Sequence, residues 1–373
     1  MEFIDLKAQY RALQPAIDAR IQKVLDEAHF IGGSEVKELE TQLAAFVGRK
    51  HCVSCANGTE ALQLAFMAYG IGEGDAVFCP DMTFISSVEP AVMLGATPVF
   101  CDVDLATYNL DPASLEHQIE RVEREGKLRP RFAVAVDFLG NPADFEEISE
   151  ICSAHGIILI EDAAQGTGAS RNGKKCGSFG DIATTSFFPS KPLGCYGDGG
   201  AVFTDDDEIA AVLNSLKVHG KGPKGKYDNI RIGLNSRLDT LQAAVLLAKL
   251  EALEQEILTR QAVAKRYDEA FAGKLQIPVV AEGSVSAYAQ YCMLAESREQ
   301  RQRILDAMKA ASVPSLIYYP HVLHELVAFA PYEGGGNLPN AKRYADCNFG
   351  LPFSPYLTEE DQQRVIDTVL GVQ

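Results

Sequence analysis

The chain has 373 residues, of which 47% are hydrophobic and 23% charged, as expected for a soluble enzyme large enough to bury a substantial core. A formal net charge of −17 argues against nucleic acid or an anionic membrane surface as a partner. No apolar run approaches the roughly 18 to 20 residues of a membrane helix, no signal-peptide pattern opens the chain, and nine scattered cysteines suggest reduced thiols, so we expect a cytoplasmic protein without a membrane partner.

Two helices are predicted in the first 50 residues. Apolar residues recur at helical spacing from Ile17 to Leu25, Phe30–Gly33 interrupts the pattern, and a second helix begins at Ser34.

From His51 onward, short apolar runs alternate with helical patterns. The predicted strands are Cys52–Cys55, Ala76–Cys79, Pro98–Cys101, Phe132–Val136, Ile157–Ile160, Ile182–Phe188 and Ala201–Thr204. The predicted helices among them are Gly58–Tyr69, Thr83–Leu94 and Pro142–His155. Continuous apolar runs without alternation are typical of strands covered on both faces, which predicts a mostly parallel sheet wrapped by helices.

After Thr204 the pattern changes. A helix is expected at Asp205–Leu216, then a glycine-rich connection at 217–237, then one long helix at Leu238–Phe271. Strands near Gln290–Leu294 and Ser315–Tyr319 and helices at Arg298–Ala311 and Thr358–Leu370 would follow. This predicts a large domain over 1–245 and a smaller C-terminal α+β domain over 246–373.

A lone lysine, Lys191, stands in a loop rich in glycine and proline between two predicted strands. Pro192 keeps Lys191 out of the helical region, so the lysine is held extended. A lysine fixed in this way is a candidate Schiff-base nucleophile, although a solvated surface lysine is the ordinary alternative.

Other polar groups follow neighbouring strands and are expected at the same edge of the sheet. Asp162 and Gln165 come after Ile157–Ile160, Gly58 and Thr59 open a helix after Cys52–Cys55, and Phe84 follows Ala76–Cys79. The free N–H groups of a helix start form a phosphate cradle. Three ordinary roles remain open alternatives: helix capping for the carboxylate, a plain helix start for the glycine and a core position for the ring.

One cofactor uses all of these parts. Pyridoxal 5′-phosphate takes a lysine and an acidic partner for its ring nitrogen. Opposite charges about 4 Å apart at an effective dielectric near 20 gain about 4 kcal/mol, so Asp162 would keep that nitrogen protonated. Gly58, Thr59 and Ser186 would hold the phosphate, Phe84 would stack on the ring, and Gln165 would reach the ring hydroxyl.

Four segments carry a resemblance to a known family. They are Cys55–Leu62, Glu161–Gln165, Ser186–Gly194 and Gly233–Ala244, in this order. Together they resemble the DegT/DnrJ/EryC1/StrS family of nucleotide-sugar aminotransferases over nearly the whole chain. The resemblance implies fold type I, the aspartate-aminotransferase-like α/β fold of pyridoxal-phosphate-dependent transferases, and a homodimer with shared active sites. It also implies that Asn235 reaches the cofactor phosphate of the neighbouring subunit.

The resemblance also bears on the reaction. Sugar dehydratases of this family carry histidine in place of the lysine, so Lys191 favours transamination. The sequence of Phe187–Gly200 is most similar to the matching segment of family members that act on UDP-linked 3-keto sugars. It implies amino transfer from L-glutamate to C3 of UDP-2-acetamido-2-deoxy-3-oxo-glucuronate, a step in surface polysaccharide synthesis.

Substrate contacts are expected in two further segments. Between residues 217 and 237 lie six cations, Lys217, Lys221, Lys224, Lys226, Arg231 and Arg237, against the single acid Asp228. This local reversal of charge suits a diphosphate and a uronate carboxylate, with Arg237 and His219 as candidate contacts, although a solvated basic loop is the alternative.

The segment Ser315–His324 matches the family segment that closes over the sugar. It supplies Tyr318, Tyr319, His321 and His324, with Tyr318-Tyr319 where related 3-keto enzymes often have His-Tyr.

Two other classes of function stay open, namely different pyridoxal chemistry, such as sugar dehydration or 4-keto transamination, and a cofactor-binding regulator without turnover. No metal site is predicted, because Cys52 and Cys55 lack a second pair and lie three apart on a predicted strand, where they would point to opposite faces.

Overall fold

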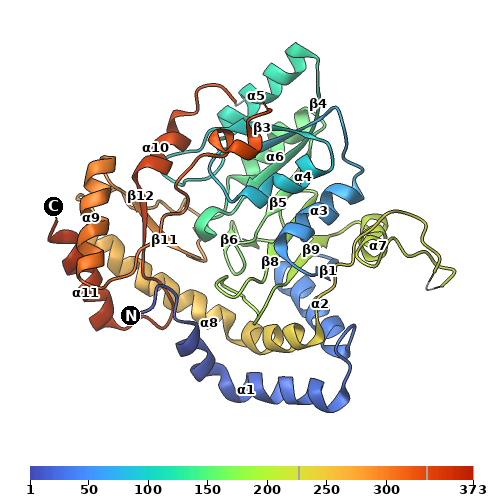
Figure 1. The fold of residues 1–373 in the computed structure, drawn as a ribbon, viewed down its shortest axis with the longest axis horizontal. Coiled ribbons are helices and arrows are strands. Elements are labelled where there is room, and N and C mark those ends of the chain that lie inside the picture. The colour runs from blue at the N-terminus through green and yellow to red at the C-terminus, as the bar shows by residue number, and fades with distance from the viewer. Residues whose placement is uncertain (226, 333–334, 373) are drawn as a thin grey trace.

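The computed structural model describes residues 1–225, 227–332 and 335–372 (Figure 1). In this part of the chain a seven-stranded sheet forms the centre, in the order β1-β9-β8-β5-β4-β2-β3. Its strands are β1 (His51–Cys55), β2 (Asp75–Pro80), β3 (Thr97–Cys101), β4 (Arg129–Val136), β5 (Ile158–Asp162), β8 (Ile182–Ser186) and β9 (Gly200–Thr204). Only β9 runs antiparallel to its neighbours β1 and β8, which confirms the expected mostly parallel sheet.

Helices cover both faces of this sheet, which is why its strands are apolar throughout. One face packs on α2 (Ser34–Val47), α5 (Pro112–Glu125), α6 (Phe145–Ala154) and the first half of α8 (Thr240–Phe271). The other packs on α3 (Gly58–Ala68), α4 (Glu89–Met93), α7 (Asp207–Leu216) and α10 (Pro339–Cys347). Successive residues of a strand alternate between these faces, so in β5 Leu159 packs in the first layer and Ile160 in the second.

The C-terminal part forms its own apolar cluster around the second half of α8. It contains β11 (Tyr291–Leu294), β12 (Asn348–Leu351), α9 (Arg298–Ala310) and α11 (Glu359–Leu370), at the left of Figure 1. The helix α1 (Leu6–Glu27) lies along the first half of α8, where Ile17 meets Val245 and Ala248. The predicted boundary at 245/246 falls inside the unbroken α8, and the division into two domains stays a prediction.

Some predicted elements differ in the structure. The helix expected at Thr83–Leu94 is instead a 3-10 turn, η1 (Ile85–Ser87), followed by the short α4, because Val88 leaves the helical region and Pro90 starts a new helix. The strand expected at Ser315–Tyr319 pairs only through Leu316 with Gly350. Sequence patterns also missed α5, α10 and β12, and the small strands β6 (Ser170–Arg171), β7 (Lys174–Lys175) and β10 (Ser284–Val285).

Within the described residues, no helix combines the length and the apolar composition needed to cross a membrane. The segment between α7 and α8, described at residues 217–225 and 227–239, extends away from the sheet at the right of Figure 1.

Candidate active site

The carboxyl ends of β5 and β8 place an acid and an amine at one edge of the sheet. Asp162 is the last residue of β5, and Lys191 lies in the loop between β8 and β9. The charge of each acts on the pKa of the other, so the two charged groups lie near each other at this edge of the sheet. The joint role that the sequence predicts for this acid and this lysine stays a prediction.

The Asp162 side chain is buried and held in place by two donors. The Ser87 hydroxyl donates to its Oδ2 at 2.8 Å, and the Ala164 N–H donates to its Oδ1 at 3.2 Å. Burial raises the pKa of the Asp162 carboxyl, while these hydrogen bonds and the Lys191 charge oppose the rise. The side chain is therefore aimed into the site by η1, an element the sequence reasoning had read as part of a longer helix.

The amine of Lys191 is tuned toward its neutral form. Burial lowers its pKa to about 8, and the Asp162 charge partly opposes this shift. An amine with this pKa is available near neutral pH both as a nucleophile and as a proton acceptor. In the described residues no hydrogen bond or ion pair occupies the Lys191 ammonium group.

The loop that carries Lys191 is fastened at several points to its surroundings. Its backbone closes on itself through Phe187 N–H to Gly199 O at 2.7 Å and Cys195 N–H to Phe187 O at 2.8 Å. The Lys249 ammonium of α8 donates to Gly194 O at 2.7 Å, and Lys249 itself is buried. A side chain at Gly194 would lie 2.4 Å from the Pro189 carbonyl, so the loop needs glycine there.

A helix start and a serine form the other side of the site. The helix α3 begins at Gly58, with the Asn57 side chain as its N-cap. A Cβ at Gly58 would lie 2.6 Å from the Ser186 Cβ, so glycine brings the N–H groups of Gly58 and Thr59 beside the Ser186 hydroxyl. The Thr59 hydroxyl is 2.8 Å from the Ser86 hydroxyl. Backbone donors at a helix start with adjacent hydroxyls suit a phosphate.

Two aromatic rings and an amide complete the cluster. Gln165 Oε1 accepts from Leu139 N–H at 2.6 Å, and its Nε2 donates to the Tyr319 hydroxyl at 3.4 Å. Phe84 remains 52% exposed, and its ring centroid is 5.8 Å from that of Tyr319. An exposed ring at this rim leaves a face for a planar ligand.

We call seven of the predicted residues the cofactor cluster: Gly58, Thr59, Phe84, Asp162, Gln165, Ser186 and Lys191. The contacts above join them through Ser86, Ser87 and Tyr319. The donor set fits pyridoxal phosphate, because it combines an acid, a neutral-prone amine, an exposed ring and a phosphate cradle that a side chain at Gly58 would fill.

The basic loop, residues 217–225 and 227–237, meets the start of the phosphate cradle only through Ser236, whose hydroxyl accepts from Ala56 N–H at 3.2 Å in the described residues. Asn235, Arg237 and His219 are exposed, and among the described residues no hydrogen bond or ion pair links their side chains to the cofactor cluster. Lys217 is engaged elsewhere, since its ammonium donates to Glu40 and to the Ser54 carbonyl, both at 3.1 Å. Lys226 lies outside the described residues.

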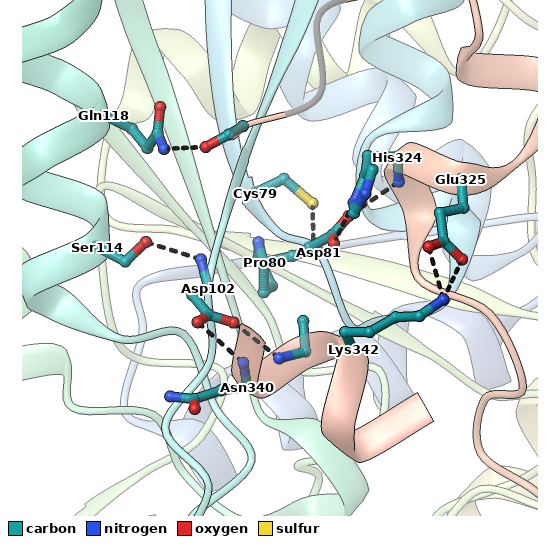
Figure 2. A network of polar contacts seen from close by, with 12 residues as sticks. Cys79, Pro80, Asp81, Asp102, Ser114, Gln118, His324, Glu325, Asn340 and Lys342 are labelled. Atoms are coloured by element: carbon teal, nitrogen blue, oxygen red, sulfur yellow. Dashed lines mark hydrogen bonds and ion pairs between the residues drawn. The ribbon is translucent and has the colours of Figure 1, made fainter. Parts of the chain in front are cut away.

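The segment 315–324 brings only some of its predicted residues to the site. Tyr319 contacts Gln165 and Phe84, whereas the Tyr318 ring stacks on Phe3 at 6.1 Å and His321 is exposed. Figure 2 shows that His324 is turned to Asp81, with 2.6 Å between its Nδ1 and Oδ2. Its backbone N–H also donates to Asp81, so this histidine anchors the segment to the end of β2.

Comparisons with known proteins find similar chains over nearly the whole length of this one. The model of the DegT/DnrJ/EryC1/StrS aminotransferase family matches residues 12–370. A UDP-2-acetamido-2-deoxy-3-oxo-D-glucuronate aminotransferase of Pseudomonas aeruginosa is 46% identical over 358 residues, covering 96% of each chain. A pleiotropic regulatory protein of Geobacillus stearothermophilus is 38% identical, covering 98% of this chain and 96% of the relative.

Two solved structures extend the comparison. An aminotransferase of the same family from Brucella abortus superposes with a TM-score of 0.97 at 44% identity, covering 100% of this chain and 99% of the other. NtdA from Bacillus subtilis, solved with the bound cofactor PMP, gives a TM-score of 0.90 at 25% identity, covering 100% of this chain and 85% of the other. The expected type I fold is confirmed by these neighbours.

Proposed function

We infer from its membership of the DegT/DnrJ/EryC1/StrS aminotransferase family, to which the chain belongs, that it aminates a UDP-linked 3-keto sugar. The chain is a pyridoxal-phosphate-dependent sugar aminotransferase. Its substrate in this proposal is UDP-2-acetamido-2-deoxy-3-oxo-glucuronate, the compound in the printed name of the P. aeruginosa relative, and its amino donor is L-glutamate. The reaction takes place in the cytoplasm and serves surface polysaccharide synthesis, such as that of O-antigen.

The observation that carries the proposal is the pairing of Lys191 with Asp162 beside a phosphate cradle. An amine with a pKa of about 8 faces a buried acid, and the N–H groups of Gly58 and Thr59 lie next to the Ser186 hydroxyl. An ordinary surface lysine has neither the lowered pKa nor such neighbours.

Each residue of the cofactor cluster has one role in holding pyridoxal phosphate. Gly58, Thr59 and Ser186 bind the phosphate, and Asp162 pairs with the ring nitrogen. Phe84 stacks on the ring and Gln165 donates toward the ring hydroxyl. The bound cofactor supplies an electron sink for the carbon that loses its proton.

Lys191 moves the proton in this mechanism. Its neutral amine takes a proton from the α-carbon of the amino donor and, in the second half of the reaction, delivers a proton to C3 of the sugar. The loop contacts at Gly194 and Phe187 limit how far Nζ travels between these atoms. Ser87 and Ala164 donate to the two oxygens of Asp162 and favour its ionised form against the effect of burial, which raises its pKa.

The second half of the site comes from a neighbouring copy of the chain in this proposal. Asn235 and Arg237 are exposed on the basic loop, which extends away from its own sheet (Figure 1). Ile230 and Ile232 on the same loop are 54% and 88% exposed, which suits a segment that packs on another subunit. In the homodimer, Asn235 binds the cofactor phosphate of its partner, and Arg237 and His219 contact the nucleotide sugar. Within its own chain Tyr319 lines the sugar side, and His324 anchors this segment to Asp81.

The test is amino transfer to a panel of UDP-linked 3-keto and 4-keto sugars with L-glutamate, with product mass as the readout. We expect a product only from 3-keto sugars, with the uronate preferred over its uncharged analogue because of the basic loop. A product from 4-keto sugars alone, or loss of water in place of amination, would contradict the proposal.

A second candidate is a cofactor-binding regulator without turnover, which the name of the G. stearothermophilus relative favours. Protein that binds the cofactor but leaves every keto sugar and glutamate unchanged would support this candidate over catalysis.

A further inference from the structure

Two carboxyl groups lie buried directly behind the cofactor acid. Asp137 follows β4, and Glu161 precedes Asp162 in the neighbouring strand β5. One carboxylate oxygen of each and the Cys176 sulfur lie within 4.8 Å of one another. Because side chains alternate along a strand, Glu161 points away from Asp162, into the opposite layer of helices. None of these three residues has a role in the proposed reaction.

The hydrogen bonds of the two acids are unequal. Glu161 accepts from Gly177 N–H at 2.6 Å and from Phe179 N–H at 2.7 Å, one at each oxygen. Asp137 accepts a long bond of 3.4 Å from Ala143 N–H at Oδ1, and the Cys176 thiol lowers the pKa of Asp137 only in part. Among the described residues, no backbone N–H donates to its fully buried Oδ2. An ionised Asp137 would therefore carry an unsatisfied oxygen beside a second negative charge, which is a costly arrangement in a protein interior.

The charged groups around the pair do not remove this conflict. Arg49 lowers the pKa of Glu161, but its guanidinium donates to the Phe179 and Gly180 carbonyls and to Asp205. The Cys176 thiol is neutral, because burial and the two acids raise its pKa. A proton on Asp137 satisfies both acids, since it turns Oδ2 into a donor toward the Glu161 carboxylate.

We propose that Asp137 holds a proton in the folded protein and donates it in a hydrogen bond to ionised Glu161, and that this pair positions Asp162 and Gln165. Burial and the neighbouring Glu161 raise the pKa of Asp137 well above its usual range. Burial also raises the pKa of Glu161, to about 7, while its backbone donors oppose the rise. The pair thus carries at most one negative charge at neutral pH, and that charge belongs to Glu161.

The positioning role follows from the contacts of residues 137–140. The Asp137 N–H donates to the Asp162 carbonyl at 3.1 Å, and the Leu139 N–H donates to Gln165 Oε1 at 2.6 Å. A Cβ at Gly166 would lie 2.3 Å from Asp137 Oδ2, so this carboxyl packs directly under the turn that carries Gln165. Anything that moves the Asp137 side chain shifts both residues that face the cofactor.

A matched set of variants tests the proton. Asp137→Asn keeps a neutral group of the same shape that donates to Glu161, whereas Asp137→Ala removes the donor and leaves a cavity. Glu161→Gln replaces one carboxylate oxygen by an NH2 group, which cannot accept a hydrogen bond from the backbone N–H that it would face. We expect Asp137→Asn to bind pyridoxal phosphate within about threefold of the wild type, and Asp137→Ala and Glu161→Gln to bind it at least about tenfold more weakly. An Asp137→Asn variant as impaired as Asp137→Ala would overturn the proposal.

The pH dependence of folding gives a readout independent of catalysis. The unfolded Asp137 ionises above its ordinary pKa of about 4, whereas the folded residue keeps its proton, so unfolding releases a proton and stability falls as the pH rises. Asp137→Asn lacks this proton. The ratio of its folding constant to that of the wild type should therefore rise about tenfold per pH unit from pH 5 to pH 7. Urea unfolding of the cofactor-free proteins measures this ratio, and a ratio that does not change with pH would contradict the proposal.

Two further measurements keep the test independent of reversible unfolding. The infrared spectrum of the wild type should contain a protonated carboxyl band that Asp137→Asn lacks, and its absence would count against the proton. Metal analysis of the purified wild type should find no bound ion. One equivalent of metal that Asp137→Asn loses would mean that the cluster with Cys176 is a metal site. Because none of these readouts uses turnover, they remain decisive if the proposed sugar substrate is wrong.

Discussion

The cofactor cluster and the basic loop differ in how completely one chain builds them. In the cofactor cluster, Asp162 has two donors, Gln165 has partners on both sides, and Lys191 sits in a loop fastened to α8. On the basic loop, Asn235, Arg237 and Ile232 are exposed, and no hydrogen bond or ion pair within the described residues links their side chains to the cluster. One chain therefore positions the groups that hold the reacting atoms. The groups of the basic loop that are proposed to bind the phosphate and the nucleotide would do so only on a second subunit. Burial within one chain thus shifts the pKa values of Lys191 and Asp162, and association with a second copy would complete the binding site.

The largest expected effect comes from the amine itself. Lys191→Ala should lower kcat by at least about 10⁴-fold, because it removes the group that moves the proton, while the protein still folds. Product mass measures turnover, and the circular dichroism spectrum of the variant measures whether it folds. Lys309→Ala, which removes an exposed lysine of α9, is the control. A Lys191→Ala variant that aminates the keto sugar at the normal rate would refute this role.

The next effect concerns the acid that faces the cofactor. Asp162→Asn keeps the shape and the Ser87 contact but removes a charge worth about 4 kcal/mol at about 4 Å, so kcat should fall about 10³-fold. Steady-state kinetics at saturating cofactor measure this loss. Ser87→Ala, which removes one hydrogen bond but leaves the charge, should cost far less, and equal losses in the two variants would show that the charge is not the decisive property.

The lowered pKa of Lys191 predicts how cofactor uptake depends on pH. Only the neutral amine attacks an aldehyde, so below its pKa of about 8 the rate of pyridoxal phosphate uptake by the cofactor-free protein should fall about tenfold per pH unit. Stopped-flow absorbance from pH 6 to pH 9 measures the rate. A rate that still rises tenfold per unit above pH 9 would mean an ordinary, solvated lysine.

The basic loop is tested by mixing two impaired variants. Asn235→Ala should weaken cofactor binding about tenfold, since it removes a hydrogen bond to a charged group. If Asn235 acts on the partner subunit, a mixture of Asn235→Ala and Lys191→Ala should regain activity, because each mixed dimer contains one intact site, for a yield of about a quarter of wild type. If mass measurement shows mixed dimers but the mixture does not regain activity, Asn235 acts in the site of its own subunit.

The smallest effect is expected at the fastening of the lysine loop. Lys249→Met removes the donor to the Gly194 carbonyl and should destabilise the protein by about 1–3 kcal/mol, with a modest fall in kcat. Lys249→Arg retains a donor and serves as the matched comparison in urea unfolding. Equal stability of Lys249→Met and the wild type would show that the loop is held by its own backbone bonds alone.

Sequence reasoning identified the chemically unusual residues but missed their supports. Lys191, Asp162 and Gly58 follow strands in a repeating strand-helix pattern, and such positions converge at one edge of a parallel sheet. Ser87 and Lys249 gave no comparable signal, because each is an ordinary residue within a helical pattern. Their contacts cross 75 and 55 positions of the chain. His324 was expected at the substrate, and its contact with Asp81, 243 positions away, was equally invisible.

By itself, the amino-acid sequence determined the parallel α/β architecture, the family and the candidate residues for pyridoxal chemistry, because strand periodicity and local motifs are properties of neighbouring residues. Only the tertiary structure decided which groups surround them. The pKa of Lys191, the donors of Asp162 and the proton proposed for Asp137 depend on burial and on side chains from distant segments. Desolvation and Coulomb interactions depend on distances in space, which a one-dimensional pattern does not contain.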